Sequence, residues 1–248
     1  LGGDVPLLDL PVDAPRPAIQ SFRGAIDPFD LPDDASAAIR ELAREHRTSL
    51  FAACTAAVKV LLFRYTGADD IVVGAPVAGR NHPDLQDQVG FFVNMLALRD
   101  RLTATDSVSE TIQRVKSTIE TALDHSFYPF DLLVENLDLD RDTGRNPLFD
   151  VVVSFRDAPT QTGRIRGLDM EPVAFEPGIS KFDLTFFFEE KEDRSIGLAI
   201  EYSTDLFRRE RIQRMTDHLN ELLRSMVCDP SADIGGIDIL PRAERARL

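Results

Sequence analysis

Apolar positions along the chain fall into short segments with two different periodicities. Residues 31–47 and 206–227 carry apolar side chains at spacings of three and four, which predicts two amphipathic helices. Residues 50–65 are apolar on nearly every side, which predicts a buried central helix. Thr48 or Ser49 can cap that helix, because a hydroxyl accepts a hydrogen bond from the first free backbone amides.

A further amphipathic helix is predicted to begin after residue 107. Ser107 and Glu110 have the spacing of a capping box, in which each side chain satisfies a backbone amide at the helix start. Apolar residues then follow at spacings of four and three: Val108, Ile112, Val115, Ile119 and Leu123. A short helix over 131–137 is predicted beyond the sequence YPF, which breaks the preceding helix.

Strands are predicted where short apolar runs are rich in β-branched and aromatic residues. Residues 71–78 form an uninterrupted run of this kind, typical of a strand covered on both faces. A second strand is expected within 89–99 and a third over 150–155. Residues 181–190 alternate apolar and polar positions, with Phe182, Leu184, Phe186 and Phe188 on one face, and with 196–203 they predict a hairpin.

The remaining segments complete the predicted architecture. Residues 168–175 are expected to form another strand, whereas the Pro-rich residues 1–30 are expected to be irregular and to lie on the surface as a connector. Residues 241–248 are polar and predict the start of a linker. The order of elements predicts an α/β fold over residues 31–240, a two-layer α+β sandwich in which helices pack on a mixed sheet.

Composition narrows the class of partner. The formal net charge of −14 repels nucleic acid and anionic lipid and argues against both as partners. No run of 18 apolar residues is present, which argues against a membrane span, and the first residues lack the pattern of a signal peptide. Cys54 and Cys228 lie in apolar runs and are expected to be buried free thiols, typical of a reducing, cytoplasmic setting.

No complete active site is visible in the residues. The histidines lie apart from one another and outside any nucleophile elbow, and no phosphate-binding glycine loop is present. No Cys and His grouping has the spacing of metal ligands. We therefore expect no catalytic residue, no metal and no directly bound cofactor in this chain. The four histidines are His46, His82, His125 and His218.

Two polar residues near the strands need partners. Asn94 stands in the apolar sequence VGFFVNMLALR, and a buried amide without partners costs about 1–3 kcal/mol. Asn94 either satisfies the backbone of a neighbouring loop or faces a channel, where it orients a substrate amide or an active-site loop. Arg80 is expected to hold the loop after it by an ion pair with Asp84 or Asp87.

Three motifs carry a resemblance to a known family. The sequences VVGAPVAGR (72–80) and VGFFVNMLALR (89–99) resemble the fifth motif of condensation domains of nonribosomal peptide synthetases. HSFYPFD (125–131) is similar to the sixth motif, His-Gln-Asp-x-Pro-Phe-Glu, and DTGRNPLF (142–149) is similar to the seventh. The resemblance suggests Arg80, Gly90, Phe91 and Asn94 as tunnel-lining or loop-supporting residues, and Pro129, Phe130, Arg145 and Asn146 as structural motif residues.

The chain departs from the family pattern in two respects. Ser126 and Phe127 replace the Gln and Asp of the sixth motif, which weakens the case for a polar role of that loop. The family's catalytic motif, His-His-x-x-x-Asp-Gly, is absent from the sequence. In the family this motif lies in the N-terminal lobe. The resemblance therefore implies a C-terminal lobe, with residues 1–30 as the connector between the lobes.

The resemblance also implies a fold and a function. Family members have two lobes similar to chloramphenicol acetyltransferase, with a tunnel between them in which an amine attacks a thioester. The implied partners are the N-terminal lobe, donor and acceptor carrier proteins bearing phosphopantetheine, and a neighbouring adenylation domain. The loop over 77–93 would lie under the tunnel, and a segment within 165–186 would reach the other lobe. The alternative is a non-catalytic module that docks carrier proteins or recruits a tailoring enzyme.

Overall fold

One mixed sheet organises the computed structural model, which describes residues 5–80, 82–137, 139, 142–156 and 177–247. Its six strands lie in the order β1-β6-β5-β4-β2-β3. The pairs β1–β6, β5–β6 and β2–β3 are antiparallel, whereas β2–β4 and β4–β5 are parallel. The strands are β1 (Gly24–Asp30), β2 (Asp70–Val77), β3 (Asn94–Arg101), β4 (Val151–Arg156), β5 (Leu184–Glu190) and β6 (Ile196–Ser203).

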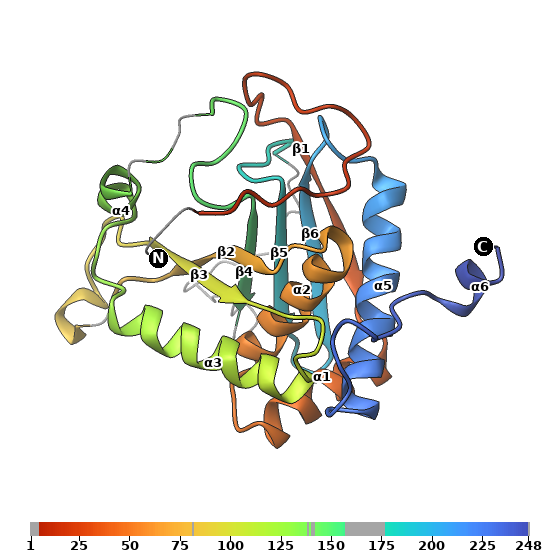
Figure 1. The fold of residues 1–248 in the computed structure, drawn as a ribbon. Coiled ribbons are helices and arrows are strands. Elements are labelled where there is room, and N and C mark those ends of the chain that lie inside the picture. Colours follow the sequence, from red (N-terminus) through yellow and green to blue (C-terminus); the bar gives the residue numbers. More distant parts are fainter. Residues whose placement is uncertain (1–4, 81, 138, 140–141, 157–176, 248) are drawn as a thin grey trace, which may run out of the picture.

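Four long helices pack together on one face of this sheet (Figure 1). They are α1 (Asp33–Glu45), α2 (Leu50–Thr66), α3 (Val108–Asp124) and α5 (Arg209–Cys228). Three shorter helices lie outside this layer: η1 (Pro83–Leu85), α4 (Phe130–Asn136) and α6 (Arg242–Arg245). The arrangement is the α/β sandwich of a mixed sheet with packed helices that the sequence predicts.

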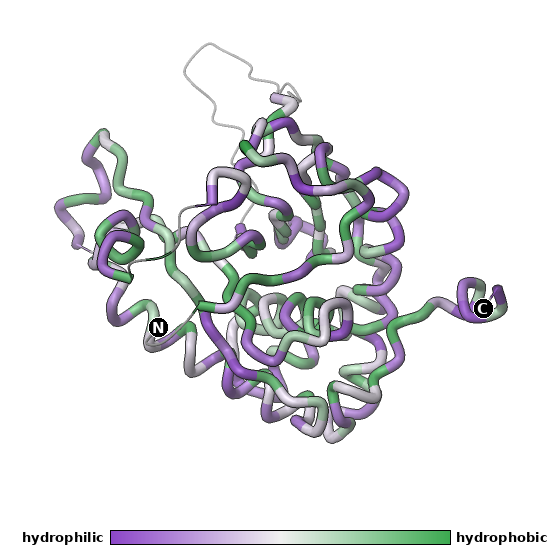
Figure 2. Tube along the Cα trace, turned by 45° about the horizontal axis from the view of Figure 1, so that its top comes forward, coloured by the Kyte–Doolittle hydropathy of each residue, from purple (hydrophilic) through white to green (hydrophobic). Residues whose placement is uncertain are grey.

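The main core lies between the sheet and the helices. Leu184, Phe186 and Phe188 alternate along β5, and each is fully buried against this layer. Helix α2 is buried on nearly every side, because α1, α3 and α5 flank it while the sheet lies beneath it. Figure 2 shows the hydrophobic positions gathered along the strands and the inner helix, with hydrophilic positions on the outer turns.

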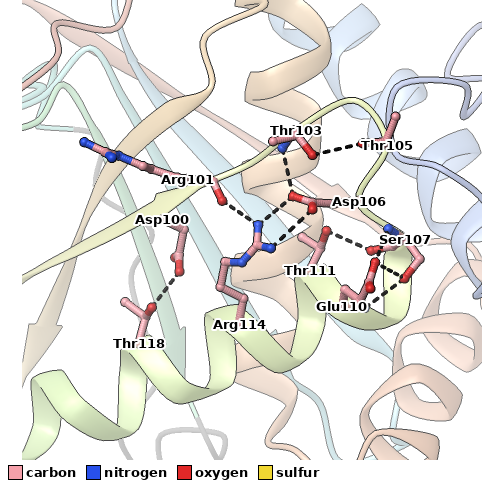
Figure 3. A network of polar contacts seen from close by, with 10 residues as sticks. All are labelled: Asp100, Arg101, Thr103, Thr105, Asp106, Ser107, Glu110, Thr111, Arg114 and Thr118. Carbon is pink, nitrogen blue, oxygen red and sulfur yellow. Dashed lines mark hydrogen bonds and ion pairs between the residues drawn. The ribbon is translucent and has the colours of Figure 1, made fainter.

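Local capping fixes where two of the helices begin and end. The Ser49 side chain accepts a hydrogen bond from the Ala52 amide, and α2 ends at Gly67 in the left-handed conformation, with φ of 67°. At the start of α3, Ser107 and Glu110 form the complete capping box. Figure 3 shows this network continuing to β3, where Arg114 contacts the carbonyl oxygen of Arg101.

The structure corrects the sequence-based prediction at several positions. Residues 24–30 are not irregular: they form β1, an edge strand paired along its whole length with β6. Leu123 leaves the buried stripe of α3 and is 48% exposed. Cys54 is buried, but Cys228 is exposed at the end of α5. Phe182 packs in a second apolar cluster on the other face of the sheet, apart from Leu184.

One expected strand and one expected contact fall on segments that the structure leaves out. The predicted strand at 168–175, and residues 165–176 of the segment expected to reach another lobe, lie outside the described residues. Within the described part of the chain, no single helix is long and apolar enough to cross a membrane, although α1 and α2, bent by 111°, pass that test of length and composition together.

Candidate functional site

Asn94, the first residue of β3, holds the turn that follows α3. Its amide nitrogen donates hydrogen bonds to the carbonyl oxygens of Ser126 at 2.9 Å and Tyr128 at 2.8 Å. Its carbonyl oxygen accepts a hydrogen bond from the Phe130 amide at 3.1 Å. The side chain thus fixes three backbone groups of the turn 126–130. This geometry corresponds to the first alternative, in which Asn94 satisfies a neighbouring loop.

Arg80 is the centre of the loop between β2 and β3, residues 78–93. Its guanidinium donates hydrogen bonds to the carbonyl oxygens of Leu85, Gln88 and Gly90, the second of them at 2.7 Å. It also lies over the ring of Phe92, 4.4 Å from the centroid, in a cation–π contact. Among the described residues its partners are carbonyl oxygens and a ring. The expected ion pair with Asp84 or Asp87 is therefore not formed.

The same loop presents apolar side chains to solvent. Gly79, its second residue, has φ of 64°, and a Cβ there would lie 1.9 Å from the carbonyl oxygen of Phe92, so only glycine fits. Gly90 follows near the tip, where its carbonyl faces Arg80. Phe91 is 91% exposed beyond it. The loop is held from inside by Arg80 and exposes Phe91 outward.

An aromatic cluster joins the sixth and seventh motifs. Pro129 occupies the N-cap position of α4, and Phe130 begins the helix and packs against Phe149, with ring centroids 5.4 Å apart. Phe149 also stacks on Phe182 at 5.7 Å. At Gly74 of β2, a Cβ would lie 2.2 Å from the Phe149 ring, so the absence of a side chain there makes room for it. Phe149 therefore connects β2, α4 and the segment just before β5.

The seventh motif also contributes to a buried ionic network. Arg145 lies 3.4 Å from the Asp150 carboxylate and donates a hydrogen bond to the Leu8 carbonyl. Next to this pair, Arg16 holds Asp183 through two contacts, one of them 2.9 Å long. Burial, and then the charge of Asp183, raise the pKa of Asp150 to about 6.

Asn146 acts beside this network on the backbone. Its side-chain amide donates a hydrogen bond to the Lys181 carbonyl at 2.8 Å. Gln20, in the N-terminal segment, donates to the same carbonyl at 2.9 Å. Asn146 therefore connects the loop before β4 to the segment that leads into β5.

The face of the sheet opposite the long helices, which we call the open face, carries two adjoining cavities. The open face is formed by the side chains of Val152, Ser154, Thr185, Phe187, Ala199 and Glu201, which alternate with the core residues of β4, β5 and β6. One cavity, of about 500 Å³, lies over β1, β5 and β6. The other, of about 420 Å³, lies over β2, β4 and β5. Phe187 and Glu201 line both cavities, so together they form one groove across the strands.

A third cavity, of about 710 Å³, lies between the edge strand β3 and α3. Met95, Arg99 and Thr118 line its walls, and His125 and Tyr128 lie at the end close to the turn 126–130. Thr118 donates a hydrogen bond to Asp100, whose carboxylate also holds the fully buried Lys59. The wall of this cavity is therefore fixed from behind by a buried ion pair.

Two groups of residues near the candidate site escape the sequence-based prediction. Arg16 lies in the segment treated as a connector, and its partner Asp183 lies 167 positions away, so no local pattern joins them. Thr185 and Glu201 occupy the polar positions of the predicted hairpin. The alternation along β5 and β6 is itself the signal that these side chains share the second face of the sheet.

Comparison with known proteins agrees with the motifs. The model of the condensation domain family matches residues 1–248, and the chain belongs to this family. Tyrocidine synthase 3 of Brevibacillus parabrevis is 40% identical over 245 residues, covering 99% of this chain and 4% of that protein. Bacitracin synthase 1 of Bacillus licheniformis is 37% identical over 246 residues, covering 99% of this chain. The chain spans 4% and 5% of the lengths of these two relatives.

Solved structures share the fold. The X-domain in its complex with OxyB from teicoplanin biosynthesis superimposes with a TM-score of 0.85 at 27% identity, over 97% of this chain and 53% of that one. A four-domain nonribosomal peptide synthetase bound to AMP and glycine also gives a TM-score of 0.85, at 24% identity, over 97% of this chain and 19% of that one. At 24% identity, the likeness to the four-domain synthetase shows a shared fold alone.

Within the described residues, no group of three or more His, Cys, Asp and Glu side chains could hold a metal ion. Cys54 is fully buried in the core, and burial raises the pKa of its thiol. The described residues thus present the groove on the open face, the cavity between β3 and α3, and the two motif loops.

Proposed function

We propose that this chain is the C-terminal lobe of a nonribosomal peptide synthetase condensation domain and forms one wall of its substrate tunnel. The observation that carries the proposal is the groove of two adjoining cavities on the open face of the sheet. A wall of this kind supplies shape and a few polar atoms. The catalytic double-His motif, absent from these 248 residues, is supplied by the N-terminal lobe.

The reaction is amide formation between two carrier-bound substrates. The amine nitrogen of the acceptor attacks the carbonyl carbon of the donor thioester; the C–N bond forms, the C–S bond breaks, and the amine proton leaves with the thiol. Amide formation from a thioester is favourable, so holding the two groups in line supplies much of the rate. This lobe contributes to that positioning and is inactive alone.

The exposed apolar residues support contacts with partners. Phe91, in the loop held by Arg80, is suited to packing against the N-terminal lobe. Phe127 and Leu132, 72% and 45% exposed around the start of α4, are suited to docking a carrier protein. The phosphopantetheine arm of that carrier then carries the substrate into the groove, and no cofactor is bound by the lobe itself.

The test is an assay of the complete domain. This chain joined to its N-terminal lobe is expected to condense donor and acceptor thioesters on loaded carrier proteins, and absence of any amide would overturn the proposal. Phe127→Ser and Leu132→Ser are expected to lower kcat/KM about tenfold with carrier-bound substrates only. With free thioesters of N-acetylcysteamine both variants should match the wild type.

A second candidate is a non-catalytic module of the same family. Its support is the likeness to the X-domain, which is bound to the protein OxyB in its solved complex. In that case the same surfaces dock a partner protein. The upstream sequence separates the two candidates, because an intact double-His motif favours condensation and a degenerate one favours docking.

A further inference from the structure

One buried hydroxyl on the open face has no partner among the described residues. The Thr185 side chain lines the 420 Å³ cavity, and the residue is 3% exposed. Its Oγ1 atom makes no hydrogen bond there. Buried hydroxyl groups are nearly always hydrogen-bonded in folded proteins, because water is not there to replace a missing partner. An unpaired hydroxyl on a residue that lines a cavity is a candidate for binding a ligand atom.

Glu201 lies beside this hydroxyl on the neighbouring strand. Thr185 and Glu201 are directly opposed in the antiparallel register of β5 and β6. Opposed side chains on one face have Cβ atoms about 4.5–5.5 Å apart, so the hydroxyl and the carboxyl can contact one ligand atom together. Glu201 lines the same cavity.

The Glu201 carboxyl group is half-buried, and the protein already supplies it with hydrogen-bond donors. Burial raises the pKa of its carboxyl group, and the raising effect outweighs the backbone amide of Lys181, the Ser180 hydroxyl and the Lys181 charge, which all lower it. A positively charged or N–H-bearing ligand placed next to the carboxylate would stabilise its ionised form.

The remainder of the cavity wall is mostly apolar, with two further polar side chains, Ser154 and Lys181. Its apolar lining residues are Pro76, Met95, Val152, Pro177, Ile179, Phe182 and Phe187. A ligand that fits this wall has an apolar body and one end rich in N–H groups. An aminoacyl group has both properties, because its side chain can lie along the apolar wall while its amine faces the two polar atoms.

We propose that Thr185 and Glu201 form a subsite that binds the amino group of the acceptor aminoacyl thioester. Both side chains accept hydrogen bonds from its N–H groups. The apolar wall receives the acceptor's side chain. The inference rests on the proposed function and adds to it which side chains of the lobe position the nucleophile. Thr185 and Glu201 are positioning residues, and the base remains outside this chain.

The experiment uses the complete domain and a non-reactive acceptor mimic. The probe is an aminoacyl pantetheine in which an amide replaces the thioester, compared with its analogue lacking the amino group. Thr185→Val and Glu201→Gln are expected to weaken binding of the amino probe about tenfold, since hydrogen bonds to charged groups are the stronger kind. Binding of the analogue without the amine should not change, and KM for the acceptor carrier should rise.

Matched controls lie outside the cavity. Thr216→Val removes another buried hydroxyl, but this one donates to the Ile212 carbonyl within α5. Glu120→Gln neutralises an exposed carboxylate on α3. Neither control should change binding of either probe.

The outcomes separate the two proposals. If the wild-type domain makes no amide, the proposed function fails and the subsite fails with it. If the wild type makes amide while Thr185→Val and Glu201→Gln bind the amino probe as tightly as it does, the subsite alone is overturned. If Thr185→Val raises the thermal stability of the domain and leaves probe binding unchanged, the unpaired hydroxyl only costs stability and binds no ligand.

Discussion

Asn94 shows how one side chain can organise a turn that is distant in sequence. It lies 32 to 36 positions before the three backbone groups that it binds. Replacing Asn94 by Ala leaves those groups without their partners, and each unsatisfied buried group costs about 1–3 kcal/mol. We expect Asn94→Ala to lower the free energy of unfolding by about 2–3 kcal/mol, measured by urea denaturation, because the turn is only partly buried.

Asn94→Asp is the sharper variant. It keeps an acceptor for the Phe130 amide but places a carboxylate oxygen against two carbonyl oxygens, so we expect a loss at least as large as that of Asn94→Ala. If both variants retain wild-type stability while the complete domain loses condensation activity, Asn94 acts on the substrate and the turn is held by other contacts.

Asp150 gives a prediction about pH. Its pKa is raised to about 6 in the folded chain, whereas an unfolded Asp titrates near 3.9. Between about pH 4 and 6 the folded state therefore keeps a proton that the unfolded state has lost, and stability falls as pH rises through this window. The free energy of unfolding should fall by about 3 kcal/mol across this window, because the pKa differs by about 2 units and each unit corresponds to about 1.36 kcal/mol. Asp150→Asn is expected to remove this fall.

The measurement is the difference in unfolding free energy between wild type and Asp150→Asn at several pH values. Carboxylates that are far from Asp150 behave alike in both proteins, so their effects cancel in the difference. A difference for Asp150→Asn that does not change with pH would show that Asp150 titrates normally in the folded chain.

For single residues, the sequence indicates which side chains need polar partners, but it does not identify those partners. The apolar flanks of Asn94 indicate a residue in need of partners, but only the packing of α3 and α4 against β3 decides that the partners are backbone groups. Arg80 was expected to pair with a carboxylate. The loop instead curls around its guanidinium and directs carbonyl oxygens at it, a geometry set by backbone turns that composition does not reveal.

At the scale of elements, β2 and Phe149 are fitted to each other through Gly74. A methyl group at Gly74 would overlap the Phe149 ring. Gly74→Ala should therefore destabilise the chain by about 1–3 kcal/mol, the usual cost of overpacking a core. The expected loss is measured as a shift of the urea midpoint at constant slope.

A double-mutant cycle checks the cause. Phe149→Leu removes the part of the ring that Gly74 accommodates, and it costs stability by itself. If the ring is the obstacle, the double variant Gly74→Ala, Phe149→Leu is less destabilised than the sum of the two single changes. Strict additivity would show that Gly74 matters to the backbone of β2 and not to Phe149.

Elements with strong periodicity were predictable, and those defined by pairing were not. The capping box and the apolar stripe place α3 correctly, and the hairpin of β5 and β6 follows from its alternation. β1 has no comparable signal, because GAIDPFD contains a proline and two acidic residues. It is a strand because β6 offers it a free edge, and an edge strand tolerates proline.

At the scale of the molecule, the N-terminal segment fastens together parts that are far apart in the chain. Asp13 pairs with Arg211 at the start of α5, and Arg16 pairs with Asp183 just before β5. Arg16 also donates a hydrogen bond to the Gly144 carbonyl in the seventh motif. The segment is thus part of the packed fold: it contacts α5 in the helix layer and the loops that lead into β4 and β5.

The ion pairs Arg16–Asp183 and Asp13–Arg211 differ in burial, so their contributions to the free energy of unfolding should also differ. Asp183 is 3% exposed and lies near Asp150, so without Arg16 two buried carboxylates would face each other. Breaking a buried pair costs about 3–5 kcal/mol; Arg16 is partly exposed, so we expect about 2–4 kcal/mol for Arg16→Gln. Arg211→Gln breaks the more exposed pair and should cost about 1 kcal/mol or less.

Limited proteolysis with urea denaturation distinguishes a fastened segment from a merely stable one. Arg16→Gln is expected to speed cleavage within residues 5–23 as well as to lower the midpoint of unfolding, because the segment loses its contacts with Asp183 and Gly144 together. If cleavage quickens equally in Arg211→Gln, the two ion pairs hold the segment alike and burial does not rank them. If neither variant is cleaved faster, the buried apolar residues Leu8 and Leu10 hold the segment without either pair.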